Sequence, residues 1–88
     1  MFISVMKLRE GIGKYDRIRD TRVDMGITQT RVAQRLNIAQ NTLSQYENGV
    51  INIPVDILIQ LAVLYGVSVD YLLGLTDVRT PYPRKKRR

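Results

Sequence analysis

The chain has 88 residues, enough for one small domain with a single core. It contains no Cys and no His, which excludes disulfides and thiolate metal sites and removes the commonest general base, so we expect neither an enzyme nor a metal or cofactor site. No apolar run approaches the roughly 20 residues of a membrane-spanning helix, and charge enters too early for a secretory signal. These features favour a cytoplasmic protein that makes no membrane contact.

The net charge of +6 is unevenly distributed along the chain. Residues 79–88 hold six basic and no acidic side chains, whereas residues 1–78 hold eight of each, with all eight basic groups before residue 48. Prolines and a block of like charge predict that 79–88 is a disordered basic tail, suited to nucleic acid. Residues 1–14 are a second appendage, expected to pack on the domain or on a dimer. The domain itself is predicted at residues 15–78.

The first predicted helix runs from about Asp16 to Met25, with Ile18 and Met25 on one apolar stripe and Gly26 as its stop. A second helix begins after Thr28, which is a good N-cap, and continues to Leu36. Its core residues are expected to be Val32, Ala33 and Leu36. Asn37 is a plausible left-handed terminator, so the second helix has only about two turns.

The third helix is predicted from about Gln40 to Asn48, with Gly49 after its C-cap. Its core face carries Leu43, Tyr46 and Glu47. The opposite face carries uncharged amides and a hydroxyl, from Gln40, Asn41, Ser44, Gln45 and Asn48. Asn and Gln can each form two hydrogen bonds with adenine, so this face suits base edges, although an ordinary polar surface is the simpler alternative. Ala39 precedes the helix and offers no capping oxygen.

The fourth helix, from Pro54 to about Tyr65, is apolar almost all round. One stripe, expected in the core, contains Ile57, Leu58, Leu61, Ala62 and Tyr65. The second stripe contains Val55, Ile59 and Val63, and Val50, Ile51 and Ile53 are expected to join it. A domain of this size buries one stripe, so the second predicts a twofold homodimer or, as the less favoured alternative, a cover formed by residues 2–6.

Three sequence blocks are similar to those of a known family: TQ-x-x-VA at residues 28–33, YENG at 46–49 and GVSVDYLLG at 66–74. In order and spacing they resemble the Cro/phage-repressor (XRE) helix-turn-helix family, over residues 16–77. The resemblance implies an all-α, five-helix, lambda-repressor-like DNA-binding domain. Helices 2 and 3 of that domain would form the helix-turn-helix.

The resemblance also implies roles for individual residues. The base-reading positions are Gln40, Asn41, Ser44 and Gln45. The phosphate-contacting positions are Thr28 and Gln29, at a helix N-terminus, with Thr42 and Asn48. Arg31 and Arg35 lie one turn apart and either contact phosphates or remain solvated charges. Arg22 and Glu47 fall on core-facing positions and are expected to form a structural ion pair.

These features predict a sequence-specific regulator of transcription that binds double-stranded DNA, a repressor that reads a pseudo-palindromic operator as a homodimer. Such a protein would be cytoplasmic, nucleoid-associated, and encoded by a bacterium or a phage. The loop at residues 50–53 lacks the basic residues that relatives often place there, and the basic tail could compensate. The alternative is an antitoxin or another module of the same fold that holds a partner protein, with DNA binding secondary.

Overall fold

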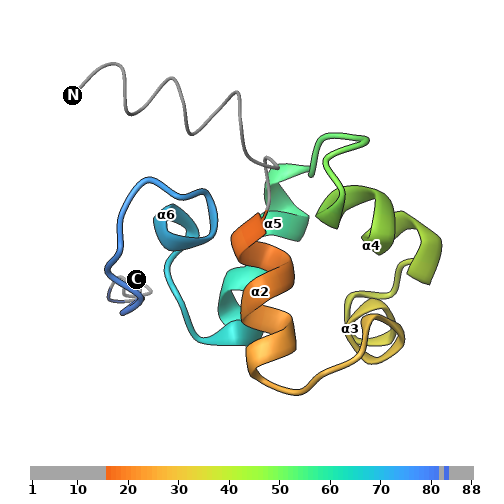
Figure 1. The fold of residues 1–88 in the computed structure, drawn as a ribbon, viewed down its shortest axis with the longest axis horizontal. Helices are drawn as coiled ribbons and strands as arrows, with labels where there is room; N and C mark the ends of the chain where they lie inside the picture. Colours follow the sequence, from red (N-terminus) through yellow and green to blue (C-terminus); the bar gives the residue numbers. More distant parts are fainter. Residues whose placement is uncertain (1–15, 82, 84–88) are drawn as a thin grey trace, which may run out of the picture.

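The computed structural model describes residues 16–81 and 83, in which five helices follow one another without a strand (Figure 1). The helices are α2 (Asp16–Asp24), α3 (Gln29–Leu36), α4 (Gln40–Glu47), α5 (Val55–Tyr65) and α6 (Val69–Leu72). The predicted all-α, five-helix fold is confirmed for this part of the chain. Residues 1–15, 82 and 84–88, which include the N-terminal extension and most of the tail, lie outside the described residues.

The central helix is α2, which contacts α4, α5 and α6. It buries Ile18 and Thr21, whereas Met25 is 45% exposed, so the prediction that Met25 shares the core stripe of Ile18 was wrong. The helix ends at Asp24, and Gly26 takes a left-handed φ of 71°. Thr21 occupies the position one turn after Ile18, and the buried part of the helix ends before Met25.

The helix α5 shows the two stripes expected from its sequence. Leu61, Ala62 and Tyr65 are buried, and Ile57 and Leu58 pack against the core. On the other side, Val55, Ile59 and Val63 are 71%, 50% and 69% exposed. The loop before the helix required a correction, because Ile53 packs against the core and does not join the exposed stripe as Val50 and Ile51 do.

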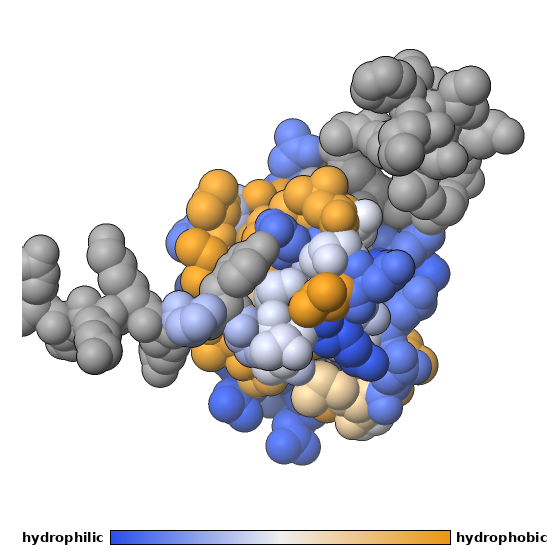
Figure 2. All heavy atoms as spheres, turned by 90° about the vertical axis from the view of Figure 1, so that its left-hand side faces the viewer, coloured by the Kyte–Doolittle hydropathy of each residue, from blue (hydrophilic) through white to orange (hydrophobic). Residues whose placement is uncertain are grey.

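The segment after α6 folds back onto the domain. The backbone N–H of Ser68 donates to the carbonyl of Arg79 over 2.9 Å, and the Ser68 hydroxyl donates to the carbonyl of Val78 over 3.2 Å. Figure 2, which looks onto this side of the molecule, shows apolar residues along one edge of the face and hydrophilic residues along the other. None of the helices in residues 16–81 is long and apolar enough to cross a membrane.

The same segment is held by Arg17, at the start of α2. Its guanidinium donates to the carbonyls of Tyr71 and Thr76 over 3.2 and 2.6 Å and to Asp77 Oδ1 over 2.6 Å. It also lies 4.2 Å from the centre of the Tyr71 ring, and the guanidinium of Arg79 lies 5.1 Å from the same centre. Hydrogen bonds and cation–π contacts thus fasten both ends of the domain to each other.

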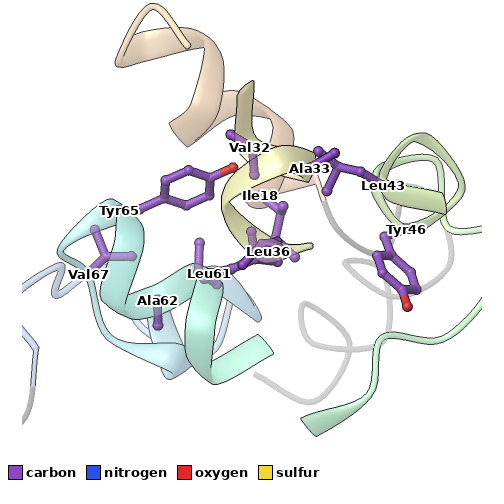
Figure 3. Packing of buried hydrophobic residues seen from close by; sticks show 11 residues of the cluster. Ile18, Val32, Ala33, Leu36, Leu43, Tyr46, Leu61, Ala62, Tyr65 and Val67 are labelled. Carbon is purple, nitrogen blue, oxygen red and sulfur yellow. The ribbon is translucent and has the colours of Figure 1, made fainter. Parts of the chain in front are cut away.

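The core is formed where α2, α3 and α5 meet (Figure 3). Val32 and Leu36 from α3 and Leu61 and Tyr65 from α5 point toward one another around Ile18. Leu43 extends this cluster to α4. Because Leu43 is fully buried, the orientation of α4 about its own axis is fixed, and its polar face must point away from the core.

Candidate nucleic-acid interface

A short turn joins α3 and α4 and has the caps that the sequence predicted. The Thr28 hydroxyl accepts a hydrogen bond from the backbone N–H of Arg31 over 3.2 Å, at the start of α3. At its end Asn37 takes a left-handed φ of 60°, and the N–H groups of Asn37 and Ile38 donate to the carbonyls of Gln34 and Ala33. Ile38 packs against the core, so the turn has little freedom to move.

The helix α4 presents a polar face without charge. Leu43, Tyr46 and Glu47 are buried, as predicted, which leaves the four residues assigned to base reading outside the core. Gln40 and Asn41 are exposed, and Ser44 and Gln45 are half-buried. No side-chain hydrogen bond caps the helix at Ala39, so its first N–H groups depend on water or a ligand.

The proposed phosphate-contacting residues surround this face. Thr42 is half-buried and Asn48, the C-cap of α4, is exposed. The Asn48 side-chain amide donates to the Ser44 hydroxyl over 3.4 Å, which joins one base-reading and one phosphate-contacting position. Gly49 follows with a left-handed φ of 73° and ends the helix where the sequence placed its stop.

An ion pair lies beneath the face. Arg22 Nε donates to Glu47 Oε2 over 2.7 Å and Nη2 donates to Oε1 over 3.1 Å, with side chains that are 12% and 1% exposed. Arg22 Nη1 donates in addition to the carbonyl of Ile27 over 2.9 Å. The hydrogen bonds to Glu47 raise the pKa of Arg22 above its ordinary value, so the guanidinium remains charged and fixes α2 to α4.

Two glutamines carry hydrogen bonds from this pair to the surface. Gln29 Nε2 donates to Glu47 Oε1 over 2.9 Å, and Gln40 Nε2 donates to Gln29 Oε1 over 3.2 Å. Because an ionised carboxylate only accepts hydrogen bonds, the NH₂ group of Gln29 must face Glu47 and its oxygen must face Gln40. Gln40 therefore keeps its own oxygen and one N–H free to point outward. The sequence did not predict this chain of contacts, which joins residues 18 and 11 positions apart.

The two arginines of α3 are both exposed, but they lie against different surroundings. Arg35 borders a groove between α3 and α5 of about 270 Å³, together with Leu36, Ile59, Gln60, Val63 and Leu64. Arg31, one turn earlier, is not part of this groove. The structure thus places Arg35 beside the exposed stripe of α5. In residues 16–81 and 83 no three acidic side chains gather at a spacing that suits a metal ion.

Comparison with known proteins identifies the fold. A family model described as "Helix-turn-helix" matches residues 18–72. The chain is 44% identical over 62 residues to the HTH-type transcriptional regulator ImmR of Bacillus subtilis, which covers 70% of this chain and 49% of that protein.

A second relative is the uncharacterized HTH-type transcriptional regulator YobD of Bacillus subtilis. It is 40% identical over 72 residues, which are 82% of this chain and 62% of that protein. The chain thus spans about half to three fifths of the length of these relatives. Residues 18–72, which the family model matches, contain the whole arrangement of caps, turn and polar face described above. The chain belongs to the Cro/phage-repressor (XRE) family of helix-turn-helix DNA-binding transcriptional regulators.

Proposed function

We propose that this protein is a sequence-specific repressor that inserts α4 into the major groove of double-stranded DNA. The observation that carries the proposal is the uncharged face of α4, on which Gln40 is oriented through Gln29 by the buried Arg22–Glu47 pair. Gln40 keeps one outward acceptor and one outward donor, the pattern that pairs with N6 and N7 of adenine. A side-chain amide that contacted only water would not require a fixed orientation.

Phosphate contacts would come from the start of α3. Its first N–H groups have no partner inside the helix, and the helix dipole adds partial positive charge there. The side-chain amide of Gln29 already binds Glu47 and Gln40, so its backbone N–H is the group available to a phosphate. In this arrangement α3 fixes the position on the duplex, and α4 reads the bases.

A pseudo-palindromic operator follows if two copies bind together, because a twofold protein matches two half-sites about one helical turn apart. Repression is proposed because a protein that occupies the groove at a promoter excludes polymerase by steric overlap. This mode of action requires no surface beyond the DNA-binding one.

The test begins by selecting bound duplexes from a random library with the purified protein. On the selected sequence, Gln40→Ala and Asn41→Ala should each weaken binding by about 1 to 3 kcal/mol, while binding to random DNA changes little. Gln34→Ala, which removes an exposed amide from the outer side of α3, is the matched control and should leave both affinities unchanged.

Two results would contradict the proposal. Failure to enrich any sequence would exclude specific reading. Equal weakening of selected and random DNA by Gln40→Ala would make Gln40 a backbone contact and remove the argument from its orientation.

A further inference from the structure

The exposed side of α5 has a shape that suits another helix. Ile59 and Val63 form a ridge between two grooves. The first groove is the one of about 270 Å³ that Arg35 borders. The second, of about 380 Å³, lies between α5 and the C-terminal segment and is lined by Ala62, Val67, Val69 and Pro81 among others. Helices pack by inserting the ridges of one into the grooves of the other, so a ridge flanked by grooves offers a packing surface for a second helix.

Two charged groups flank this surface without an ion pair in the described residues. Arg35 stands at the rim of the first groove, beside the C-terminal half of α5. Asp56 lies in the first turn of α5 and is exposed. Helical spacing places Asp56 on the exposed side, between Val63 and Gln60 in angle and therefore turned toward the groove of Arg35. The two opposite charges thus lie on one side of the ridge, toward opposite ends of the helix.

We propose that two copies of this chain pack their α5 helices antiparallel about a twofold axis, so that Arg35 of each pairs with the partner's Asp56. A twofold axis perpendicular to α5 reverses the direction of the helix and keeps its first groove on the same side. The C-terminal half of one α5, with Arg35 beside it, then faces the first turn of the other. Parallel packing would instead place the two first grooves on opposite sides of the contact, so that neither Arg35 would meet the partner's Asp56.

This arrangement assigns Arg35 to the dimer and leaves Arg31 as the arginine of α3 that is free for phosphate. Val55, Ile59 and Val63 supply the apolar contact, and the two symmetric ion pairs select its direction. The inference rests on the proposed function, because a twofold dimer would serve to bind a pseudo-palindromic operator. The pairing itself is a property of the protein without DNA, so it can be tested separately.

The test measures dimer dissociation by sedimentation without DNA. Arg35→Glu and Asp56→Arg each replace two attractions with two repulsions, and each should raise the dissociation constant about tenfold or more. The double variant, Arg35→Glu with Asp56→Arg, should restore dimerisation to within about threefold of the original. Arg31→Glu, one turn away on the same helix, is the matched control and should leave the constant unchanged. Circular dichroism must show native helix content in all four variants.

The inference would be overturned by a native protein that is monomeric at about 1 mM, by single variants that leave dimerisation unchanged, or by a double variant that stays as weak as the singles. A dimer that forms only after residues 1–14 are removed would show that this segment covers the ridge, and would also overturn it. Binding of a single half-site by the Arg35→Glu monomer keeps the two proposals apart. If this variant still binds a single half-site, the proposal that α4 reads bases is retained even where the dimer proposal fails.

Discussion

At the scale of single residues, the hydroxyl of Tyr65 is in an unfavourable environment. It is buried and has no hydrogen-bond partner among the described residues, within the cluster that holds α3 against α5 (Figure 3). Burial of an unpaired hydroxyl costs free energy, because water bonded to it in the unfolded chain. The buried ring of Tyr65 stabilises the fold, whereas its unpaired hydroxyl destabilises it.

Tyr65→Phe should therefore stabilise the protein. Removal of the unpaired oxygen with retention of the ring is expected to raise the free energy of unfolding by about 1 kcal/mol at neutral pH. Urea denaturation followed by circular dichroism measures this change. Tyr71→Phe is a suitable comparison, because Tyr71 is only half-buried and its ring contacts Arg17 and Arg79 whether or not the hydroxyl is present.

The same residue predicts a dependence on alkaline pH. Burial raises the pKa of Tyr65 above its ordinary value of 10.0, and the negative charge of Glu47 raises it further. Above pH 10 the unfolded chain loses this proton while the folded chain keeps it, so stability falls as the pH rises. The slope should be up to about 1.4 kcal/mol per pH unit steeper than in Tyr65→Phe. Parallel curves for the two proteins between pH 9 and 11 would show that the hydroxyl ionises equally in both states.

At the scale of elements, α3 and α4 are equal in length but differ in their starts. Thr28 caps α3 through its hydroxyl, whereas Ala39 leaves the start of α4 uncapped by any side chain. The backbone of Ala39, with φ −72° and ψ 146°, closely matches that of Thr28, with φ −79° and ψ 159°. A residue with a hydroxyl would thus reach the N–H groups of α4 without backbone change.

Ala39→Ser should accordingly raise the free energy of unfolding by about 1 kcal/mol, and Thr28→Ala should lower it by a similar amount. Thermal and urea denaturation of both variants measure the two effects. No gain from Ala39→Ser would mean that water already satisfies the first N–H groups of α4 as well as a side chain can.

Local signals explain which elements the sequence predicted well. The cap at Thr28, the left-handed Asn37 and Gly49, and the spacing of Leu43 and Tyr46 act within one or two turns, so they can be recognised without the fold. Met25 was misassigned because it lies past the buried part of α2, and helical spacing alone does not indicate where the core ends. Gln29 was expected at a phosphate-contacting position. The hydrogen bonds of its side chain with Glu47 and Gln40 were not predicted, because they depend on how α3 lies against α4.

At the scale of the whole molecule, the start of α2 is fastened to α6 and to the segment that follows it. Arg17 contacts Tyr71, Thr76 and Asp77, which are 54 to 60 positions away, and no local pattern in the sequence indicates such a contact. Figure 1 shows α6 and the blue segment that follows it on the opposite side of α2 from α3 and α4. The segment held by Arg17 therefore lies apart from the face proposed to read DNA.

Arg17→Ala should loosen the C-terminal segment and leave α4 intact. Loss of two hydrogen bonds to carbonyls, an ion pair and a cation–π contact should speed amide exchange at Ser68 about tenfold or more, since this N–H donates to Arg79. Amide exchange at Leu43 should change only as much as the free energy of global unfolding changes. Arg19→Ala, which removes only ion pairs of 3.7 and 3.6 Å on the same helix, is the control. Equal exchange in both variants would contradict a specific role for Arg17.

The buried carboxylate of Glu47 would influence which base pairs this protein prefers under the proposed function. Its inability to donate sets which end of the Gln29 amide faces inward, and that amide in turn sets which end of Gln40 is left for the proposed contact with a base. Glu47→Gln would supply a donor at the same place and allow both glutamines to turn over, which would exchange donor and acceptor at the proposed base contact. Under the proposed function, a residue only 2% exposed would then influence which base pair is preferred, so specificity could evolve from inside the core.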